Sequence, residues 1–282
     1  MAHDITGLKK WLGEKETAVD YVTVPTVHRL SALLDRDDPF PKIGDPLPLG
    51  WHAILFPRVV RHSQIGPDGH PARGDFLPPV PLPRRMFAGK TVTFADGLRV
   101  GDEVRRESTI QQIESKEGRT GPMVFVTVKT DIYSPRGLAI TELQNIVYRD
   151  HPKPGASPPQ PQPAPMPPKW EQAVTPDTVM LFRFSALTYN GHRIHYDLPY
   201  VTGVENYPGL IVNGGLTTLM MFELARGHAG RPVARFSSRN VSPLFVGRTL
   251  RVCGAPAEGG KLKLWVVNDQ GELALTADAE LA

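Results

Sequence analysis

Most of the chain alternates hydrophobic and polar positions with the two-residue period of a β-strand. In the first half, β-branched and aromatic residues occupy every second position in four runs: residues 90–96, 102–117, 122–134 and 138–150. The second half has four more: residues 233–242, 247–256, 261–269 and 272–281. Such alternation is typical of antiparallel strands that are buried on one face only.

Before its alternating runs, each half has a short stretch that reads as β-strand and then a helical segment. In the first half these are residues 20–24 and residues 27–35, where apolar residues recur at helical spacing after a proline suited to a first turn. In the second half, residues 178–187 form a continuous apolar run that predicts a strand. Residues 213–228 predict a helix whose apolar stripe is so wide that the helix should be almost wholly buried.

A proline-rich stretch separates these two similar halves. Residues 151–169 contain few amide donors and little apolar bulk, which predicts an extended linker across the surface. We therefore divide the chain into repeats at 1–150 and 170–282, and the common order of elements suggests an ancient internal duplication. A buried helix followed by antiparallel strands packs well if the sheet curls around the helix. The expected fold class is α+β, a double hot dog with two such repeats.

Composition narrows the range of partners. The 282-residue chain has a formal charge of +3 and a pI near 9.0, but its 32 basic and 29 acidic residues are interspersed. Nucleic acid is therefore not an expected partner. No stretch approaches the roughly 20 apolar residues of a membrane span, and the charged N-terminus does not resemble a secretory signal, so we expect a cytoplasmic protein with no membrane partner. The single cysteine, Cys253, is expected to be a small buried hydrophobe.

Proton-handling side chains are densest in residues 184–197, FSALTYNGHRIHYD. Histidine both accepts and donates protons near neutral pH, so His195 is the natural acid or base. Asn190 lies five positions earlier, and a loop would bring the two side chains together. A packed core histidine remains an alternative for His195, as do surface positions for His192 and Arg193. No third or fourth ligand accompanies His192 and His195 at a recognisable spacing, so we expect no metal and no cofactor.

A pair of glycines opens the predicted buried helix. Small residues at Gly214 and Gly215 would let a ligand approach the free amides and the positive end of the helix dipole. Amides in this position can stabilise negative charge on a carbonyl oxygen, an effect of roughly 3 to 4 kcal/mol per donor in measured enzymes. The alternative is that the glycines serve only the turn and close packing.

Together these motifs resemble the MaoC-like, or R-specific enoyl-CoA hydratase, family. Ile194, His195 and Asp197 match its first motif, whereas Asn190 falls on the catalytic aspartate of that family and His192 and Arg193 fall on its Asn-Pro. In the second motif three residues match and Asn213 replaces the usual histidine, the matching residues being Pro208, Gly209 and Gly214. The sequences SALTYN, HRIHYD and LPRRMFAG look most like the double-hot-dog branch, which includes mesaconyl-CoA and itaconyl-CoA hydratases and 3-hydroxyacyl-thioester dehydratases.

The resemblance implies a hydro-lyase that adds water reversibly to an enoyl-CoA thioester, here a short branched dicarboxylic one. His195, Asn190 and Gly214 would be catalytic, and a silent first repeat would contribute to binding. The expected substrate-binding residues are Arg84, Arg85, His192, Arg193, Asn213 and Gly215. An arginine suits the free carboxylate of such an acyl group because it binds in a two-pronged geometry.

Several alternatives stay open. A hot-dog thioesterase would need a carboxylate near the buried helix, for which Glu223 is the obvious candidate. A non-catalytic acyl-CoA binder would explain the missing aspartate, since asparagine has no carboxylate to remove a proton. A fatty-acid-type 3-hydroxyacyl-thioester dehydratase is the third alternative. The two halves can pair within one chain, and a homodimer of double hot dogs is possible.

Overall fold

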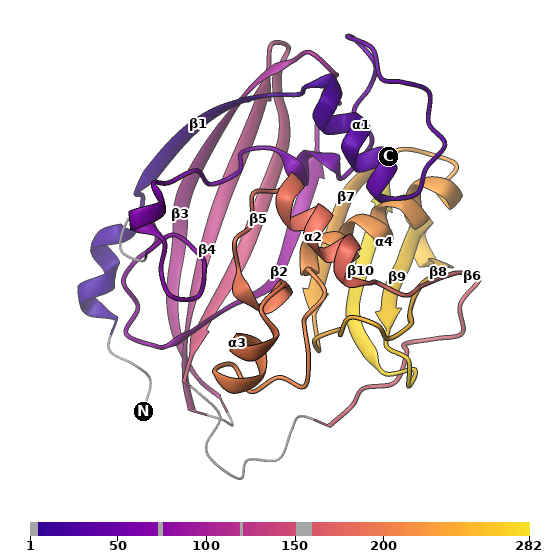
Figure 1. Ribbon diagram of the computed structural model, residues 1–282. Helices are drawn as coiled ribbons and strands as arrows, with labels where there is room; N and C mark the ends of the chain where they lie inside the picture. The colour runs from indigo at the N-terminus through magenta and orange to yellow at the C-terminus, as the bar shows by residue number, and fades with distance from the viewer. Residues whose placement is uncertain (1–4, 73–75, 119–120, 151–159) are drawn as a thin grey trace.

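The computed structural model describes residues 5–72, 76–118, 121–150 and 160–282, in which ten strands form one continuous antiparallel sheet (Figure 1). The strands are β1 (Lys15–Tyr21), β2 (Arg84–Phe94), β3 (Glu103–Gly118), β4 (Gly121–Ser134), β5 (Gly137–Arg149), β6 (Trp170–Val174), β7 (Val233–Asn240), β8 (Leu250–Ala257), β9 (Lys261–Val267) and β10 (Leu273–Leu281). The eight alternating runs of the sequence correspond to β2–β5 and β7–β10, as predicted.

The sheet is built symmetrically about a seam between the two halves. The strands follow the order β1-β3-β4-β5-β2-β7-β10-β9-β8-β6. Equivalent strands of the two halves therefore lie at equal distances from the β2–β7 pair. At the seam Gly89 pairs with Arg239 and Thr91 with Ser237, so the two halves do join within one chain. The division into repeats at residues 150 and 170 stays a prediction.

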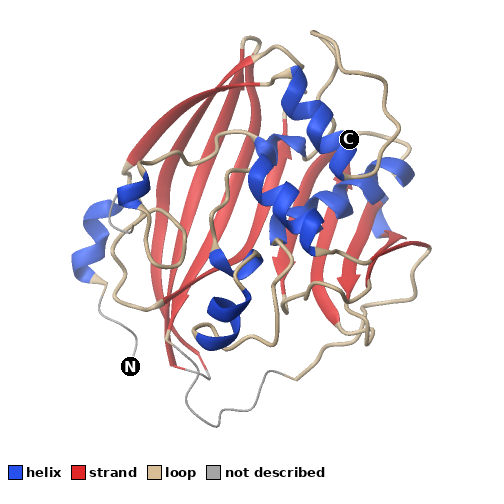
Figure 2. Ribbon diagram, in the orientation of Figure 1, coloured by secondary structure: helices blue, strands red, loops and turns tan. Residues whose placement is uncertain are grey.

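The helices gather on one face of the sheet (Figure 2). They are α1 (Val24–Leu33), α2 (Thr178–Leu187), α3 (Leu198–Gly203) and α4 (Gly214–His228), with 3-10 turns at Thr6–Trp11, Trp51–Ile54, His62–Gln64, Arg193–His195 and Glu258–Gly260. Nine of the fifteen residues of α4 are buried, which confirms the predicted buried helix. Burying one large apolar side chain contributes roughly 1.5–3 kcal/mol, so α4 is a main source of the stability of the core.

The prediction of a strand at residues 178–187 was wrong, because this segment is α2. Its buried residues, Leu181, Phe184 and Ser185, have helical spacing, while Val179 and Phe182 are 59% and 66% exposed. The exposed apolar residues filled in the pattern and hid the helical period. Asp177, which accepts a hydrogen bond from the amide of Met180 at 2.7 Å, is the N-cap signal that marks the helix start.

The two halves differ in their helices. By chain order and by its place after the first strand, α1 corresponds to α2. In the described part of the first half no helix matches the length of α4, and residues 35–72 and 76–83 run instead through loops and 3-10 turns. One large core nevertheless joins both halves: Phe94 of β2 meets Phe222 of α4 edge-on, with ring centroids 6.1 Å apart.

The predicted linker is described only in part, because residues 151–159 lie outside the described residues. From Gln162 to Lys169 the chain runs along the second half. There the carbonyl of Gln162 accepts a hydrogen bond from the amide of Leu273, and the amide of Lys169 donates to the carbonyl of Gly254.

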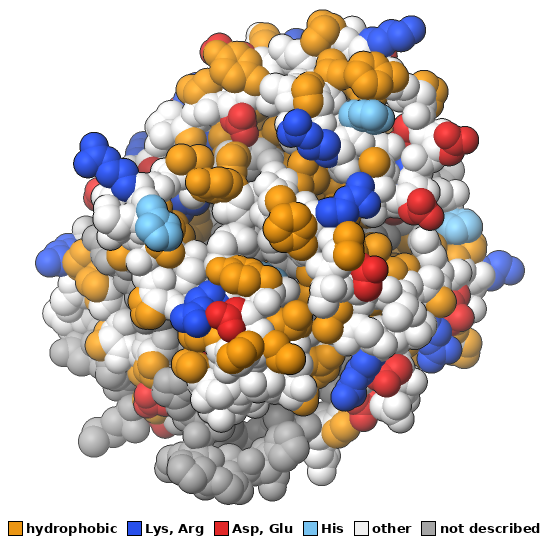
Figure 3. Space-filling view, in the orientation of Figure 1, with side chains coloured by type: hydrophobic (Ala, Val, Ile, Leu, Met, Phe, Trp, Pro, Cys, Tyr) orange, Lys and Arg blue, Asp and Glu red, His pale blue; other side chains and the backbone are white. Residues whose placement is uncertain are grey.

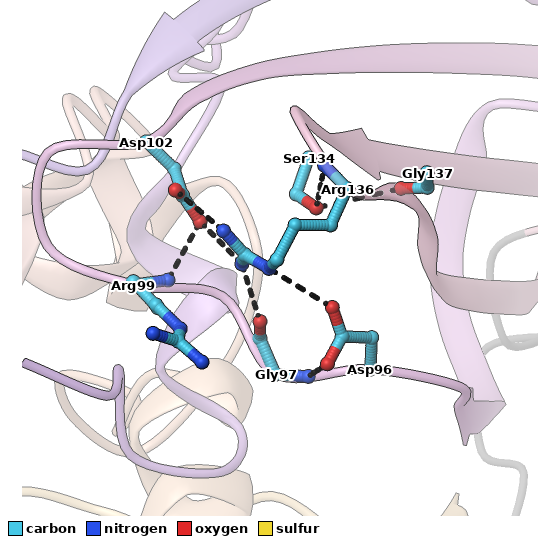
Figure 4. A network of polar contacts seen from close by, with 7 residues as sticks. All are labelled: Asp96, Gly97, Arg99, Asp102, Ser134, Arg136 and Gly137. Atoms are coloured by element: carbon cyan, nitrogen blue, oxygen red, sulfur yellow. Dashed lines mark hydrogen bonds and ion pairs between the residues drawn. The ribbon is translucent and has the colours of Figure 1, made fainter. Parts of the chain in front are cut away.

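One arginine ties together the loops of the first half at the end of the sheet (Figure 4). Arg136, in the β4–β5 turn, donates to both carboxylate oxygens of Asp102 at 3.0 and 2.8 Å and to Asp96 at 3.1 Å. Asp102 also accepts from the amide of Arg99. Burial would raise the pKa of Asp102, but these hydrogen bonds outweigh it and hold that pKa below its usual value.

Candidate functional site

A cleft of about 1600 Å³ lies where the two halves meet. Its walls come from β2 and its preceding loop, from the segment between α2 and α3, and from the start of α4. Two exposed aromatic residues of the second half, Phe182 and Tyr189, belong to its lining. Hydrophobic side chains are spread over the face of the molecule on which α2 and α3 lie, with single charged residues between them (Figure 3). The cleft is large enough for an extended ligand with apolar parts.

His195 lies in the cleft wall with only 7% of its surface exposed. Its Nδ1 is 2.7 Å from the carbonyl oxygen of Ile211. Because a carbonyl can only accept a hydrogen bond, Nδ1 carries the hydrogen and Nε2 presents a lone pair. Burial lowers the pKa of His195 to about 4, against a smaller opposing effect of this hydrogen bond. His195 is therefore a neutral imidazole at pH 7, with one nitrogen free to accept a proton.

The same contact ties His195 to the start of α4. The amide of Ile211 donates to the carbonyl of Ile194, so two hydrogen bonds fasten the histidine turn to the segment that leads into the helix. Gly214 and Gly215 are the first two residues of α4 and line the cleft. The amides of a first helical turn have no partners within the helix. A carbonyl oxygen in the cleft can therefore accept a hydrogen bond from Gly214.

Asn213 lies just behind this surface. It is 2% exposed and does not belong to the lining of the cleft. Its Nδ2 faces the hydroxyl of Ser185 at 3.5 Å, and its Oδ1 is buried without a hydrogen-bond partner among the described residues. The residue therefore packs the helix start against α2, and the structure does not bring it to the position expected for substrate binding.

Asn190 lines the cleft and follows the C-terminal end of α2, not a strand as predicted. Its side-chain Oδ1 accepts a hydrogen bond from the backbone amide of His192 at 3.0 Å. Its backbone amide donates to the backbone carbonyl of Ser185. The side-chain oxygen is thus used within the loop. The amide nitrogen Nδ2 is left to donate a hydrogen bond to a water or a substrate oxygen.

His192 lies against two other histidines. Its ring centroid is 4.0 Å from that of His70 and 5.5 Å from that of His195. Burial lowers the pKa of His192 to about 3, with the neighbouring imidazoles adding to the effect. All three residues line the cleft.

His70 belongs to a first-half hairpin that sequence reasoning missed. Its Nδ1 is 3.4 Å from Oδ2 of Asp68, whose Oδ1 accepts from the amide of His70 at 3.0 Å. Burial would raise the pKa of Asp68, but the hydrogen bonds from His70 hold it well below its usual value. Residues 68–70 lie some 120 positions before the motif, in a Gly- and Pro-rich loop. The sequence GPDGHP, residues 66–71, is typical of a turn, but it does not show that this turn packs against residues 190–193.

Asp68, His70 and His192 each offer one ligand atom, all within 4.8 Å of one another. Two imidazoles that share a tetrahedral ion at about 2.0–2.1 Å have ring centroids about 5 Å apart. The 4.0 Å separation of His70 and His192 is closer than that, so this arrangement suits ring-to-ring contact better than shared coordination. The absence of a metal stays a prediction.

Comparison with known proteins places this chain in a family. The family model of hydroxyacyl-thioester dehydratase type 2 matches residues 50–246, more than half of the chain. The chain belongs to this dehydratase family. It is 43% identical to the mesaconyl-C(4)-CoA hydratase of Chloroflexus aurantiacus over 274 residues, which cover 96% of each chain.

Solved structures show the same fold. HtdX of Mycobacterium tuberculosis superposes with a TM-score of 0.65 at 19% identity and covers 95% of this chain and 100% of its own. A second Mycobacterium tuberculosis protein, described as a double hot dog, has a TM-score of 0.55 at 13% identity and covers 95% of each chain. The predicted α+β double hot dog and the resemblance to MaoC-like proteins are confirmed. Among the described residues no helix is long and apolar enough to cross a membrane.

The arginines expected to bind substrate in this dehydratase-family protein lie in two different places. Arg84 and Arg85, at the start of β2, line the cleft, and Arg84 donates to the hydroxyl of Tyr207 at 3.0 Å. Arg193 lies outside the lining of the cleft. It pairs with Asp197 at 2.8 Å and donates to the carbonyl of Pro67 at 2.9 Å. The structure thus separates Arg193 from the other predicted binding residues.

Asp197 acts as a backbone cap. Its Oδ1 accepts from the amide of Tyr200 at the start of α3. The cysteine prediction is also confirmed: Cys253 is 2% exposed in β8, and burial raises the pKa of its thiol to about 11.

A further cation in the cleft is already paired. Lys90 of β2 is 2.9 Å from Oε2 of Glu142, and His52 faces the same oxygen at 3.6 Å. Burial would raise the pKa of Glu142, but Lys90 and His52 outweigh it and lower this pKa to about 2. Because Glu142 neutralises Lys90, the arginines of β2 are the better partners for an anionic ligand.

Proposed function

We propose that this protein adds water reversibly to the double bond of an enoyl-CoA thioester, and that mesaconyl-C(4)-CoA or a closely similar branched dicarboxylic thioester is its substrate. The observation that carries the proposal is the position of His195 and Gly214 on one cleft, joined through Ile211. The 43% identity to a mesaconyl-C(4)-CoA hydratase supports the substrate class.

The site accounts for each part of the reaction. The Gly214 amide donates to the thioester carbonyl oxygen and stabilises the negative charge that develops there, which contributes about 3 to 4 kcal/mol in measured enzymes. Nδ2 of Asn190 donates to the water, and Nε2 of His195 removes its proton as the oxygen attacks the β-carbon. The resulting enolate takes a proton at the α-carbon, so the elements of water are added and no other reactant is needed. Elimination of water from a 3-hydroxyacyl thioester is the reverse of these steps.

The carboxylate of a dicarboxylic acyl group needs a cation near the cleft. Arg85 lines the cleft on β2 and lies close enough to His192 to contribute to the lowering of its pKa. We assign carboxylate binding to Arg85, with Arg84 held beside it by Tyr207.

The carboxylate considered for the thioesterase alternative, Glu223, does not reach the cleft. Glu223 accepts from the indole Nε1 of Trp51 at 2.9 Å, pairs with Arg36 and Arg226, and does not line the cleft. A carboxylate fixed in this way cannot attack a thioester in the cleft. The family membership of the chain likewise favours water addition over thioester hydrolysis.

The deciding experiment follows the loss of enoyl absorbance with mesaconyl-C(4)-CoA and crotonyl-CoA, with products identified by mass and free thiol measured in parallel. We expect a mass gain of one water without thiol release. Thiol release without hydration would indicate a thioesterase. Tight binding with neither change would indicate a non-catalytic acyl-CoA binder.

A further inference from the structure

The proposed hydration moves two protons, but the motif of the second half supplies only one group to move them. One proton leaves the water and another reaches the α-carbon. His195 presents one ring nitrogen, because the other is held by Ile211. Asn190 has no acidic proton, and its Oδ1 is used by the amide of His192. A second acid–base group in another part of the cleft would let one residue take the proton from water while another delivers the proton to the α-carbon.

His70 is the group that the fold places there. It lines the cleft, and its ring is 4.0 Å from that of His192, which in turn is 5.5 Å from that of His195. Asp68 lies behind it, with Oδ2 3.4 Å from Nδ1. A carboxylate so placed determines which ring nitrogen carries the hydrogen and stabilises an imidazolium when one forms.

The hairpin that carries His70 is docked on the catalytic loop of the other half. The amide of Arg193 donates to the carbonyl of Asp68 at 2.9 Å, and its guanidinium donates to the carbonyl of Pro67. Gly69 has a φ of +87° and lies so close to Gly191 that a Cβ would be 1.9 Å from the Gly191 carbonyl oxygen. These contacts set the hairpin in a defined position against residues 190–193.

We propose that His70, oriented by Asp68, is the second acid–base residue of the site and exchanges the proton at the α-carbon. This inference rests on the proposed function. In hydration, His195 takes a proton from water while the hydroxyl oxygen bonds to the β-carbon. The C=C π electrons move into the enolate, and the protonated His70 gives its proton to the α-carbon.

The site then holds one proton too many on His195 and one too few on His70. Transfer through His192, which touches both rings, or through solvent restores the starting state. Dehydration runs in the opposite sense, with His70 removing the α-proton and His195 protonating the departing hydroxyl. The first half, expected to be silent, thus supplies a catalytic residue. Arg193 acts as a positioning residue through the hairpin.

Several charged and titratable groups lie around His70. The groups near the three neighbouring histidine rings of the cleft are Asp68, on the same hairpin as His70, Arg85 on β2, and His192, Arg193, His195 and Tyr200 in the second half. Asp68 contributes a negative charge to this group and Arg85 a positive one.

The test compares the full-length wild type with His70→Gln and Asp68→Asn, using mesaconyl-C(4)-CoA and crotonyl-CoA from pH 5 to 10. His28→Gln is the matched control, since His28 is exposed on α1 and does not line the cleft. For His70→Gln we expect kcat to fall by about 10²- to 10⁴-fold with little change in KM. In the dependence of kcat on pH, the wild type should lose activity at alkaline pH, where His70 is no longer protonated, and His70→Gln should lack this alkaline limb. For Asp68→Asn we expect a smaller fall in kcat and an alkaline limb at lower pH. His28→Gln should match the wild type.

Three results would overturn the inference. One is an active wild type whose pH profile is unchanged in His70→Gln; this would leave the proposed function intact. Another is loss of wild-type activity on chelation with recovery on adding zinc, which would make the cluster a metal site. A wild type that hydrates neither thioester would remove the proposed function together with this inference. If His70→Gln does not give the wild-type circular dichroism spectrum, the pH profile of Asp68→Asn decides in the same way.

Discussion

At the scale of single residues, the chemistry depends on the unprotonated nitrogen of His195. Its pKa of about 4 lies far below the ordinary histidine value, mainly because the ring is buried. A base works only when unprotonated, so its activity should be lost as the pH falls through about 4 and not near 6.5. Replacing the ring by an amide of similar size should remove the proton transfer and leave the substrate contacts in place.

We therefore expect His195→Gln to lower kcat for hydration by about 10²- to 10⁴-fold at pH 7, with KM changed little. In the wild type, kcat should not fall as the pH is lowered from 7 to 5. Initial rates across this range check both statements. A wild-type acid limb near pH 6.5 would show that the buried environment does not persist in the complex with substrate.

On the proposed function, Arg85 determines the choice between substrates. A charge-assisted hydrogen bond to a carboxylate contributes about 1.5–3 kcal/mol, which corresponds to about 10- to 150-fold in kcat/KM. Arg85→Met should therefore lower kcat/KM for mesaconyl-C(4)-CoA by this factor and leave the value for crotonyl-CoA nearly unchanged. Arg183→Met, on the exposed side of α2 and away from the cleft, is the control. An unchanged ratio between the two substrates would exclude Arg85 from carboxylate binding.

At the scale of elements, the site depends on how the hairpin of residues 65–71 docks. Alanine at position 69 would be strained by the φ of +87° and would also collide with Gly191. Alanine at Gly44 pays a similar conformational cost, with a φ of +93°, but meets no atom within 4 Å. Such a conformation costs roughly 1–3 kcal/mol for a residue with a Cβ.

Gly69→Ala should consequently lose at least as much stability as Gly44→Ala, whereas only Gly69→Ala should lose hydration activity, by at least tenfold. Thermal unfolding and kcat measured on both proteins separate the two effects. Equal activity in the two variants would mean that hairpin docking does not matter for catalysis.

The loops at the end of the first half depend on Arg136. Its removal leaves Asp102, which is only 9% exposed, without its main partner, and an unsatisfied buried group costs about 1–3 kcal/mol. The pKa of Asp102 is lowered in the folded state, so its contribution to stability is present above the unfolded value near 3.9 and is lost as the pH falls through the folded value.

Arg136→Met should thus destabilise the protein by about 1–3 kcal/mol at pH 7, and the difference from the wild type should shrink below pH 4. Urea unfolding at pH 7 and pH 3.5 measures this, with the exposed Arg29→Met as control. A difference that is the same at both pH values would contradict the assignment to Asp102.

At the scale of the whole molecule, features that depend on residues close together in the sequence could be predicted, and features that depend on distant residues could not. Strands β2–β5 and β7–β10 were found because each carries its own alternation, and α4 because its buried residues and the two glycines at its start lie close together in the chain. Helix α2 was mistaken for a strand because the exposed Val179 and Phe182 obscure its period.

The hairpin of Asp68 and His70 had no local signal. Its position depends on the Gly69–Gly191 contact and on Arg193, across more than 120 residues. Arg193 was expected to bind substrate for the same reason, since the sequence shows a cation near the motif but not the carbonyl groups that it binds. Residues whose role depends on contacts between the two halves were the ones that sequence patterns could not place.

The same dependence between halves leads to a prediction about the fold. Isolated residues 170–282 would expose the edge of β7 that pairs with β2, and Phe222 would lose its contact with Phe94. Exposed edges and apolar faces favour association with another chain. We expect this fragment to aggregate or to dimerise, and to have no hydratase activity because it lacks His70.

Co-expression of residues 1–150 with residues 170–282 should restore a one-to-one complex with activity, since the seam and the core between the halves need no covalent link. Size-exclusion chromatography with light scattering and the hydration assay test both steps. A monomeric fragment 170–282 that unfolds cooperatively and hydrates the thioester alone would show that the second half is an independent domain. It would also show that His70 is not required, because no first-half residue would then be present in the cleft.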